Sequence, residues 1–271
     1  MSYRVKGQIE VKKIVRGLLF LNFVCVVYLM LNVETVKGIA RSLIEGTDGF
    51  STGLQHVYAQ EKNPYREVSN GKVEVFIPVE KILQLPELPN GCEITSLTSV
   101  LNFHGYRVSK VDMADHYLPK EPFTTINNVL YGPDPNKAYA GNPREWSGFF
   151  SYAPPIVQAA NAYLGKEGAQ IEPVDLSGST REEIIMELEE GNPVVVWVTL
   201  DLSKKKVNYS WNIRDSKTEF NAPTNLHAVV LNGYVGDKVH VMNPLQGQVT
   251  YDADAFFASY VDLGSHAMTV K

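Results

Sequence analysis

The segment from Leu85 to Gly105 constrains the fold of this chain most, because it places a cysteine where a helix is predicted to begin. Cys92 follows two prolines and a glycine, and apolar residues then recur at helical spacing until Gly105, a suitable C-cap glycine. A thiol at a helix N-terminus lies among unpaired backbone N–H groups and at the positive end of the helix dipole. Both favour the thiolate, so we expect a lowered pKa for Cys92 and a sulfur nucleophile there. A structural thiol is the alternative, because free cysteine is among the most buried residue types.

The order of the predicted elements around this helix indicates an α+β domain. Lys72–Val79 alternates like a short strand, and a helix is expected from about Pro155 to Leu164. Thr180, with a glutamate three residues later, predicts the capped start of a further helix. Val194–Leu200 is typical of a strand buried on both faces, and a hairpin that turns at Gly236-Asp237 follows it. The cysteine therefore lies in a helix-rich half that precedes a strand-rich half.

The N-terminal part differs in composition from the rest. Gly17–Val33 is an apolar run, near the short limit for a membrane-spanning helix, and basic residues precede it. Basic residues on that side favour a cytoplasmic N-terminus and an exported C-terminal domain. We expect a single-pass anchor in residues 1–35, a tether over 36–70 and the globular domain over 71–271. The alternative is a cleaved signal and a secreted domain.

Composition excludes several classes of function. The formal net charge of −5, without a block of like charge, argues against a nucleic-acid partner. Of the two cysteines, Cys25 lies in the apolar run, so the globular part cannot close an internal disulfide. No His, Cys and Asp cluster has metal-ligand spacing, and no glycine-rich phosphate loop is present, so we expect neither a metal nor a cofactor. The sequence leaves the oligomeric state open.

A cysteine nucleophile needs a base, and the base needs an orienting group. His227 opens a predicted strand, and Asn243 ends the returning strand 16 residues later, where its carbonyl can fix the imidazole tautomer. A strict two-residue turn at Gly236-Asp237 would place Asn243 opposite Val230, whose side chain points to the other face from His227. We therefore expect an odd-length turn or a β-bulge in this hairpin. The alternative role for Asn243 is to cap the turn formed with the proline that follows it.

The oxyanion of an acyl-transfer reaction also needs hydrogen-bond donors. The backbone N–H of Cys92 is one candidate, and Gln84, eight residues upstream, carries the nearest amide that could reach the same place. Asn90 is a weaker candidate, expected to serve the turn before the helix. Glu93 is expected to act electrostatically on the first helical turn rather than as a base.

Two segments are expected to form the walls of a substrate groove. The aromatic segment from Tyr139 to Tyr152 is too long for a passive connection, and the polar stretch from Asn208 to Asn225 resembles loops or an edge hairpin. Core packing is the alternative explanation for these aromatic residues.

Four blocks in this order resemble the exported cysteine peptidase-like proteins of Gram-positive bacteria, which are related to the bacteriocin-processing double-glycine leader peptidases. The blocks are LPNGCEITSLTSVLNFHG, GNPREWSGFFSYAPPIV, NPVVVWVTL and LHAVVLNGYVGDKVHVMNP, and the resemblance covers roughly Val75 to Lys271. It implies a papain-like α+β fold, in which the cysteine helix packs against an antiparallel sheet that carries the histidine and its Asn or Asp partner.

The resemblance also implies roles for individual residues. Cys92 would be the nucleophile, His227 the general base and acid, and Asn243 the orienting residue, at a position where this family often has Asp. Gln84 would be the oxyanion donor, although papain-like enzymes usually place this glutamine six residues before the cysteine rather than eight.

Together these features predict a membrane-anchored thiol peptidase that acts outside the cell on a peptide or protein substrate. Thiolate attack would give a thioester acyl-enzyme, which water then hydrolyses. One alternative is a cell-wall amide hydrolase or acyltransferase on the same fold. Another is a catalytically inactive surface module that binds peptide or glycan.

Overall fold

The computed structural model describes residues 65–69 and 72–271, which all lie in one compact unit of the chain, Glu61–Lys271. The predicted anchor, Cys25 and residues 36–64 of the predicted tether lie outside the described residues. Within the part that is described, no helix is both long and apolar enough to cross a membrane.

Helices predicted from the sequence form at the expected places. The described helical elements are α3 (Cys92–Phe103), α4 (Lys110–Asp112), the π-helical turn η1 (Met113–Tyr117), α5 (Ala153–Glu167), α6 (Arg181–Glu189) and α7 (Ala253–Asp262). The capping box of α6 is confirmed: Glu183 N–H donates to the Thr180 side chain, and Thr180 N–H donates to the Glu183 carboxylate at 2.7 Å. The Cys92 helix is likewise confirmed.

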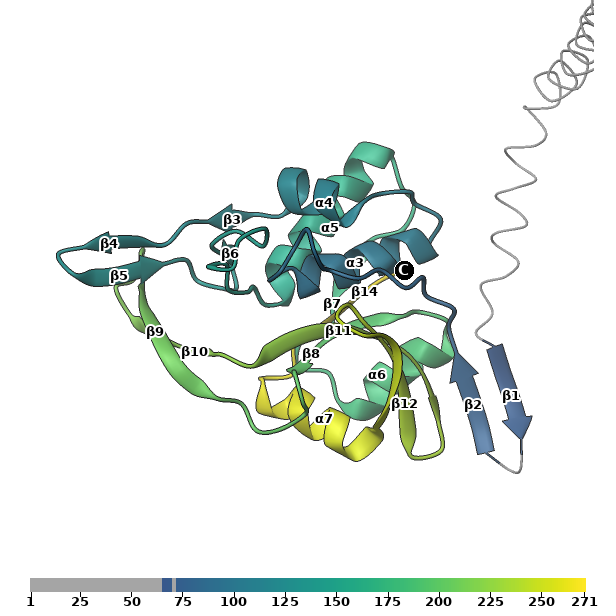
Figure 1. The fold of residues 1–271 in the computed structure, drawn as a ribbon. Helices are drawn as coiled ribbons and strands as arrows, with labels where there is room; N and C mark the ends of the chain where they lie inside the picture. Colours follow the sequence, from purple (N-terminus) through teal and green to yellow (C-terminus); the bar gives the residue numbers. More distant parts are fainter. Residues whose placement is uncertain (1–64, 70–71) are drawn as a thin grey trace, which may run out of the picture. The chain divides into compact units, whose positions relative to one another are not determined.

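An antiparallel sheet forms the centre of the domain. Its strands follow the order β1 (Tyr65–Ser69), β2 (Lys72–Phe76), β11 (Leu226–Val235), β8 (Val194–Thr199), β14 (Ala267–Val270) and β7 (Pro173–Asp175). From β11 the sheet continues through β12 (Lys238–Asn243) to β13 (Gly247–Asp252). Figure 1 shows α3 and α5 on one face of this sheet and α6 and α7 on the other, an α+β arrangement as expected.

The cysteine helix is buried against this sheet. Every residue from Cys92 to Leu101 is buried, and α3 contacts β11, β8 and α5. Ser96 Oγ donates to the carbonyl of Ala228 at 3.2 Å, so a hydrogen bond joins the helix directly to β11. Strand β8 is buried at every position, which confirms the prediction of a strand covered on both faces. These contacts fix the start of α3 relative to the start of β11.

A second sheet extends from the central one beside the start of α3 (Figure 1). Its strands follow the order β10 (Glu219–Pro223), β9 (Val207–Ile213), β5 (Val129–Gly132) and β4 (Thr124–Ile126). A short parallel pair, β3 (Lys120–Glu121) with β6 (Tyr139–Ala140), lies nearby in the sequence. Trp211 of β9 and Phe150 are buried together in a small cluster, and Trp211 Nε1 donates to the Pro133 carbonyl at 2.8 Å.

Candidate active site

Cys92 is the first residue of α3, and the chain before it is packed tightly. A Cβ atom built on Gly91 would lie 2.6 Å from Leu88 Cβ, so only glycine fits immediately before the cysteine. The side chain of Cys92 is 8% exposed. Its Sγ accepts a hydrogen bond from the backbone N–H of Ala228 at 3.4 Å and lies 3.3 Å from Glu93 Oε2, to which the thiol donates.

The expected lowering of the thiol pKa is wrong for this resting arrangement. Burial raises the pKa of Cys92 well above its ordinary value, and the negative charge of Glu93 raises it further. The Ala228 N–H lowers the pKa, as a donor to sulfur should, but less than burial raises it. The free protein therefore holds Cys92 as a thiol at neutral pH.

The hairpin of β11 and β12 contains the irregularity that the sequence predicts. Val235 pairs with Lys238 around the two-residue turn, but the register shifts between Leu231 and Gly233. Val230 consequently lies opposite Met242 instead of Asn243. A one-residue shift changes which face a side chain points to, so Asn243 now shares a face with the histidine of β11.

His227 and Asn243 meet across this corrected register. His227 Nε2 lies 2.9 Å from Asn243 Oδ1, and the ring is 3% exposed. Oδ1 also accepts the backbone N–H of Leu245 at 2.9 Å, while Asn243 Nδ2 donates to the Tyr251 hydroxyl at 3.1 Å. The amide orientation is therefore fixed, and Asn243 both orients the imidazole and caps the turn that follows it.

This contact determines the tautomer of the imidazole. Because Asn243 Oδ1 can only accept, the proton of the neutral ring lies on Nε2 and Nδ1 keeps its lone pair. Burial lowers the pKa of His227 to about 4, against a smaller raising effect of Asn243, so the ring is neutral at pH 7. Among the described residues no hydrogen bond engages Nδ1 or joins it to Cys92 Sγ. The ring therefore presents an unoccupied basic nitrogen.

The two amide candidates for the oxyanion site occupy different environments. Gln84 is 3% exposed, its Nε2 donates to the Pro89 carbonyl at 2.8 Å, and its backbone N–H donates to Pro244 at 2.8 Å. A primary amide has two N–H hydrogens, so one remains for a ligand. Asn90 donates through Nδ2 to the Glu145 carbonyl at 2.9 Å, so its side chain ties the chain before α3 to a distant loop and not to the turn that the sequence suggested.

One cavity of about 600 Å³ brings the candidate residues together. Gln84, Asn90, Cys92 and His227 all line it, whereas Asn243 lies behind the imidazole. The two segments expected to form groove walls both contribute, and none of the described lining residues is an acid, a lysine or an arginine. The uncharged and largely apolar wall residues are Leu85, Trp146, Phe149, Phe150, Leu200, Tyr209, Pro223, Leu226 and Leu245.

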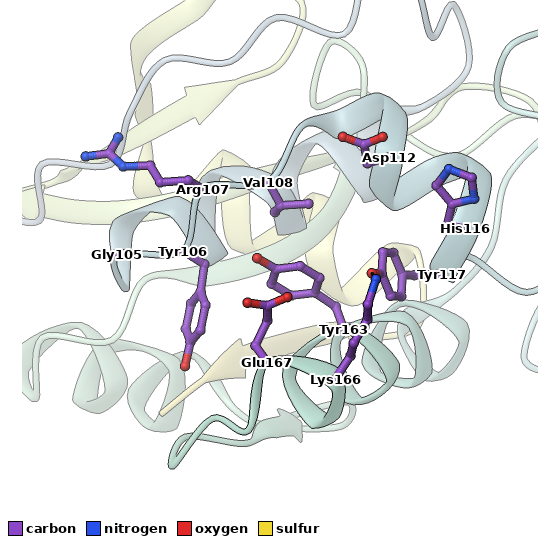
Figure 2. A pocket seen from close by; sticks show the side chains of 10 residues that line it. All are labelled: Gly105, Tyr106, Arg107, Val108, Asp112, His116, Tyr117, Tyr163, Lys166 and Glu167. Carbon is purple, nitrogen blue, oxygen red and sulfur yellow. Dashed lines mark hydrogen bonds between the residues drawn. The ribbon is translucent and has the colours of Figure 1, made fainter.

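A second hollow, of about 450 Å³, lies at the other end of α3 and is lined by none of these residues. Figure 2 shows three tyrosine rings around its rim, those of Tyr106, Tyr117 and Tyr163, with the Lys166 side chain reaching toward Tyr117. Lys166 Nζ donates to the Tyr117 hydroxyl at 3.1 Å. This hollow is polar and remote from the thiol. Within the described residues, no cluster of His, Cys, Asp and Glu could hold a metal ion.

Sequence reasoning missed the direct contact of Glu93 with the thiol. The Glu93 side chain is 0% exposed, and its Oε1 accepts the backbone N–H of Ser151 at 3.1 Å. Burial raises the pKa of Glu93 to about 7. The available signal was the sequence CEITSLTSVL, in which one charged residue stands in a helix otherwise suited to full burial.

Comparisons with known proteins give the family. A model of the Peptidase_C39 like family matches residues 76–268. The uncharacterized protein YvpB of Bacillus subtilis (strain 168) is 29% identical over 211 residues, which are 77% of this chain and 80% of that protein.

Two solved structures are also similar. A C39-like peptidase candidate from Bacillus anthracis is 29% identical with a TM-score of 0.64, covering 72% of this chain and 96% of that one. A double-glycine motif protease from an AMS/PCAT transporter, solved with its leader peptide, is 18% identical with a TM-score of 0.40, covering 76% and 95%. The extent of the family match, together with a cysteine helix packed on an antiparallel sheet, shows that this chain belongs to the Peptidase_C39 like family.

Proposed function

We propose that this chain is a thiol peptidase that hydrolyses peptide bonds with Cys92, His227 and Asn243. The observation that carries the proposal is the fixed tautomer of His227: Asn243 Oδ1 accepts from Nε2, and Nδ1 is left as a base in the cavity that Cys92 lines. Membership of the Peptidase_C39 like family supports a peptidase-like activity.

In the proposed reaction, the thiol proton of Cys92 passes to Nδ1 of His227 as the substrate carbonyl approaches. The sulfur then attacks the carbonyl carbon, and the oxyanion accepts hydrogen bonds from the Cys92 backbone N–H and the second N–H of Gln84. The imidazolium returns its proton to the leaving amine, which leaves a thioester on Cys92. Water, deprotonated by the same nitrogen, hydrolyses the thioester and restores the thiol.

The substrate class follows from the cavity walls. Trp146 is 82% exposed and stands at the rim, and Phe149 stacks on Tyr209 with ring centroids 5.1 Å apart. Apolar and aromatic walls without an acid or a basic side chain favour uncharged side chains on the substrate near the scissile bond. We also propose, from the sequence of residues 1–35 alone, that the enzyme is anchored in the cell membrane with this domain outside.

The test is incubation of the full chain with a diverse peptide library, with cleavage read by mass spectrometry. All variants carry Cys25→Ser, so that Cys92 is the only thiol. We expect cleavage next to uncharged residues, and none with Cys92→Ala or His227→Ala. Cleavage that survives Cys92→Ala would contradict the proposal. Binding of peptides without turnover, unchanged by Cys92→Ala, would identify a binding module instead.

A further inference from the structure

Glu93 is the one carboxyl group among the described residues that touches the candidate nucleophile. Its Oε2 lies 3.3 Å from Cys92 Sγ, and its Oε1 is held by the Ser151 N–H at 3.1 Å. Ser151 is itself fixed, because its carbonyl accepts Trp197 Nε1 at 2.8 Å on β8. The carboxyl group therefore has one rigid donor on one oxygen and the thiol on the other.

The surroundings of this carboxyl group contain few other charges. Tyr139 of β6 is buried near Glu93, and its hydroxyl donates to the Asn90 carbonyl at 2.6 Å, so it is occupied. His227 of β11 is neutral at pH 7 and shares the cavity with Cys92, while Trp197 and Ser151 carry no charge. No described lysine or arginine forms an ion pair with Glu93. Burial without a counter-charge brings the pKa of Glu93 to about 7.

Formation of a thiolate beside an ionised carboxylate is energetically unfavourable, because two negative charges would lie within hydrogen-bond distance of each other in a buried site. A thiol that donates to this carboxylate is also turned away from any other acceptor. If the carboxyl group carries its own proton, both obstacles disappear. Its O–H can donate to sulfur, and the thiol proton is free to pass to another base.

We propose that Glu93 is a positioning residue that decides where the proton of Cys92 goes. Ionised, it accepts the S–H and holds the sulfur as an unreactive thiol. Protonated, it releases the thiol to Nδ1 of His227 and stabilises the resulting thiolate by donating to it. The proposal rests on the proposed function, and it makes the enzyme active in mildly acidic surroundings and self-inhibited above neutrality.

The test measures alkylation of Cys92 by iodoacetamide, which needs no peptide substrate. The full chain with Cys25→Ser is compared with the same chain carrying Glu93→Gln, from about pH 5 to about pH 9, a range that brackets the pKa of Glu93. The glutamine keeps an acceptor for Ser151 and a donor for sulfur. Glu182→Gln is the matched control, because Glu182 is an exposed first-turn glutamate of α6.

In the parent we expect reactivity that falls as the pH rises through about 7 and returns only when the thiol itself ionises. Glu93→Gln should keep the low-pH reactivity to higher pH, with a rate at about pH 8 at least about ten-fold above the parent, since one pKa unit is a factor of ten in protonation. Glu182→Gln should leave the profile unchanged.

Two results would overturn the proposal. One is a Glu93→Gln profile that differs from the parent only in amplitude, which is what a merely structural role gives. The other needs no variant: a parent whose reactivity rises steadily with pH as one simple thiol titration. Failure of the proposed function looks different, because reactivity would then be the same in His227→Ala as in the parent at every pH.

Discussion

At the scale of single residues, Asn243 joins the turn after β12 to the chemistry of the imidazole. Its Oδ1 accepts from both His227 Nε2 and the Leu245 N–H, and its Nδ2 donates to Tyr251. Because three hydrogen bonds fix one amide group, the ring it contacts has little freedom to rotate. The two roles that the sequence offered for Asn243 are thus served by the same atoms.

Asn243→Ala should lower kcat by about 10²-fold and leave KM nearly unchanged, because a positioned proton-transfer group contributes about that much and this change releases the ring. Asn243→Asp should retain most of the activity, since an acceptor remains for Nε2 and for Leu245. Steady-state kinetics on a peptide cleaved in the library test measures both. Equal kcat for Asn243→Ala and the parent would show that the orientation of His227 does not depend on this contact.

Gln84 is the second residue whose role can be separated from its neighbours. Gln84→Ala should lower kcat by about 10² to 10³-fold, the cost of removing one oxyanion donor. Asn90→Ala is the comparison, because the Asn90 amide lines the same cavity and also keeps one N–H beside the one it donates to the Glu145 carbonyl. If Gln84 is the oxyanion donor, the kcat of Asn90→Ala should stay closer to that of the parent. A larger loss of kcat with Asn90→Ala than with Gln84→Ala would show that Asn90, and not Gln84, is the side-chain donor to the oxyanion.

At the scale of elements, the bulge in β11 is what brings His227 and Asn243 together. The extra residue is Asn232, whose backbone carbonyl accepts the Ile77 N–H at 2.7 Å and whose Nδ2 donates to the Ile77 carbonyl at 2.8 Å. Gly233 follows, where an added Cβ would lie 2.1 Å from the Val75 carbonyl oxygen. The segment at the end of β2 therefore holds the bulge in place.

Gly233→Ala should destabilise the domain by at least about 2 kcal/mol, because a methyl group is forced against backbone that cannot move aside. It should also reduce activity, since the register that aligns Asn243 depends on this bulge. Urea unfolding followed by tryptophan fluorescence checks the first effect. Gly165→Ala is the matched control. Gly165 lies in α5 with open space around it, so the same change should stabilise the domain by roughly 0.5–1 kcal/mol.

How far the sequence predicts this structure differs between elements. Hydrophobic periodicity predicts α3 and β8. In a regular hairpin the side chains of His227 and Asn243 would point to opposite faces, so their pairing requires an irregularity. The position of the bulge could not be predicted, because it is set by Ile77, which is 155 residues away from Asn232. The sheet containing β4 and β5 was also missed, since its residues follow no clear alternation and it is held together by aromatic packing around Trp211.

At the scale of the whole molecule, buried titratable groups make stability depend on pH in opposite directions. Burial lowers the pKa of both His227 and His266 to about 4, from an ordinary value of 6.5. Between these values the unfolded chain binds protons that the folded protein does not, so their effect is to reduce stability as the pH falls. Glu93 has its pKa raised from 4.5 to about 7, so the folded state binds the extra proton and stability rises as the pH falls through that interval.

Between about pH 6.5 and about pH 4.5 two histidines therefore oppose one carboxyl group, and the free energy of unfolding should fall with acid by about 1.4 kcal/mol per pH unit, the slope for one net proton. His266→Phe removes one of the two histidines. The His266 ring stacks on the Tyr152 ring with centroids 3.9 Å apart, a contact that phenylalanine can keep. The slope of this variant should be close to zero in urea unfolding measured across the interval. His116→Phe, at an exposed position, should keep the parent slope. If His266→Phe kept the full slope, proton uptake on unfolding would come from other groups, and burial of His266 in the neutral form would not be a source of acid sensitivity.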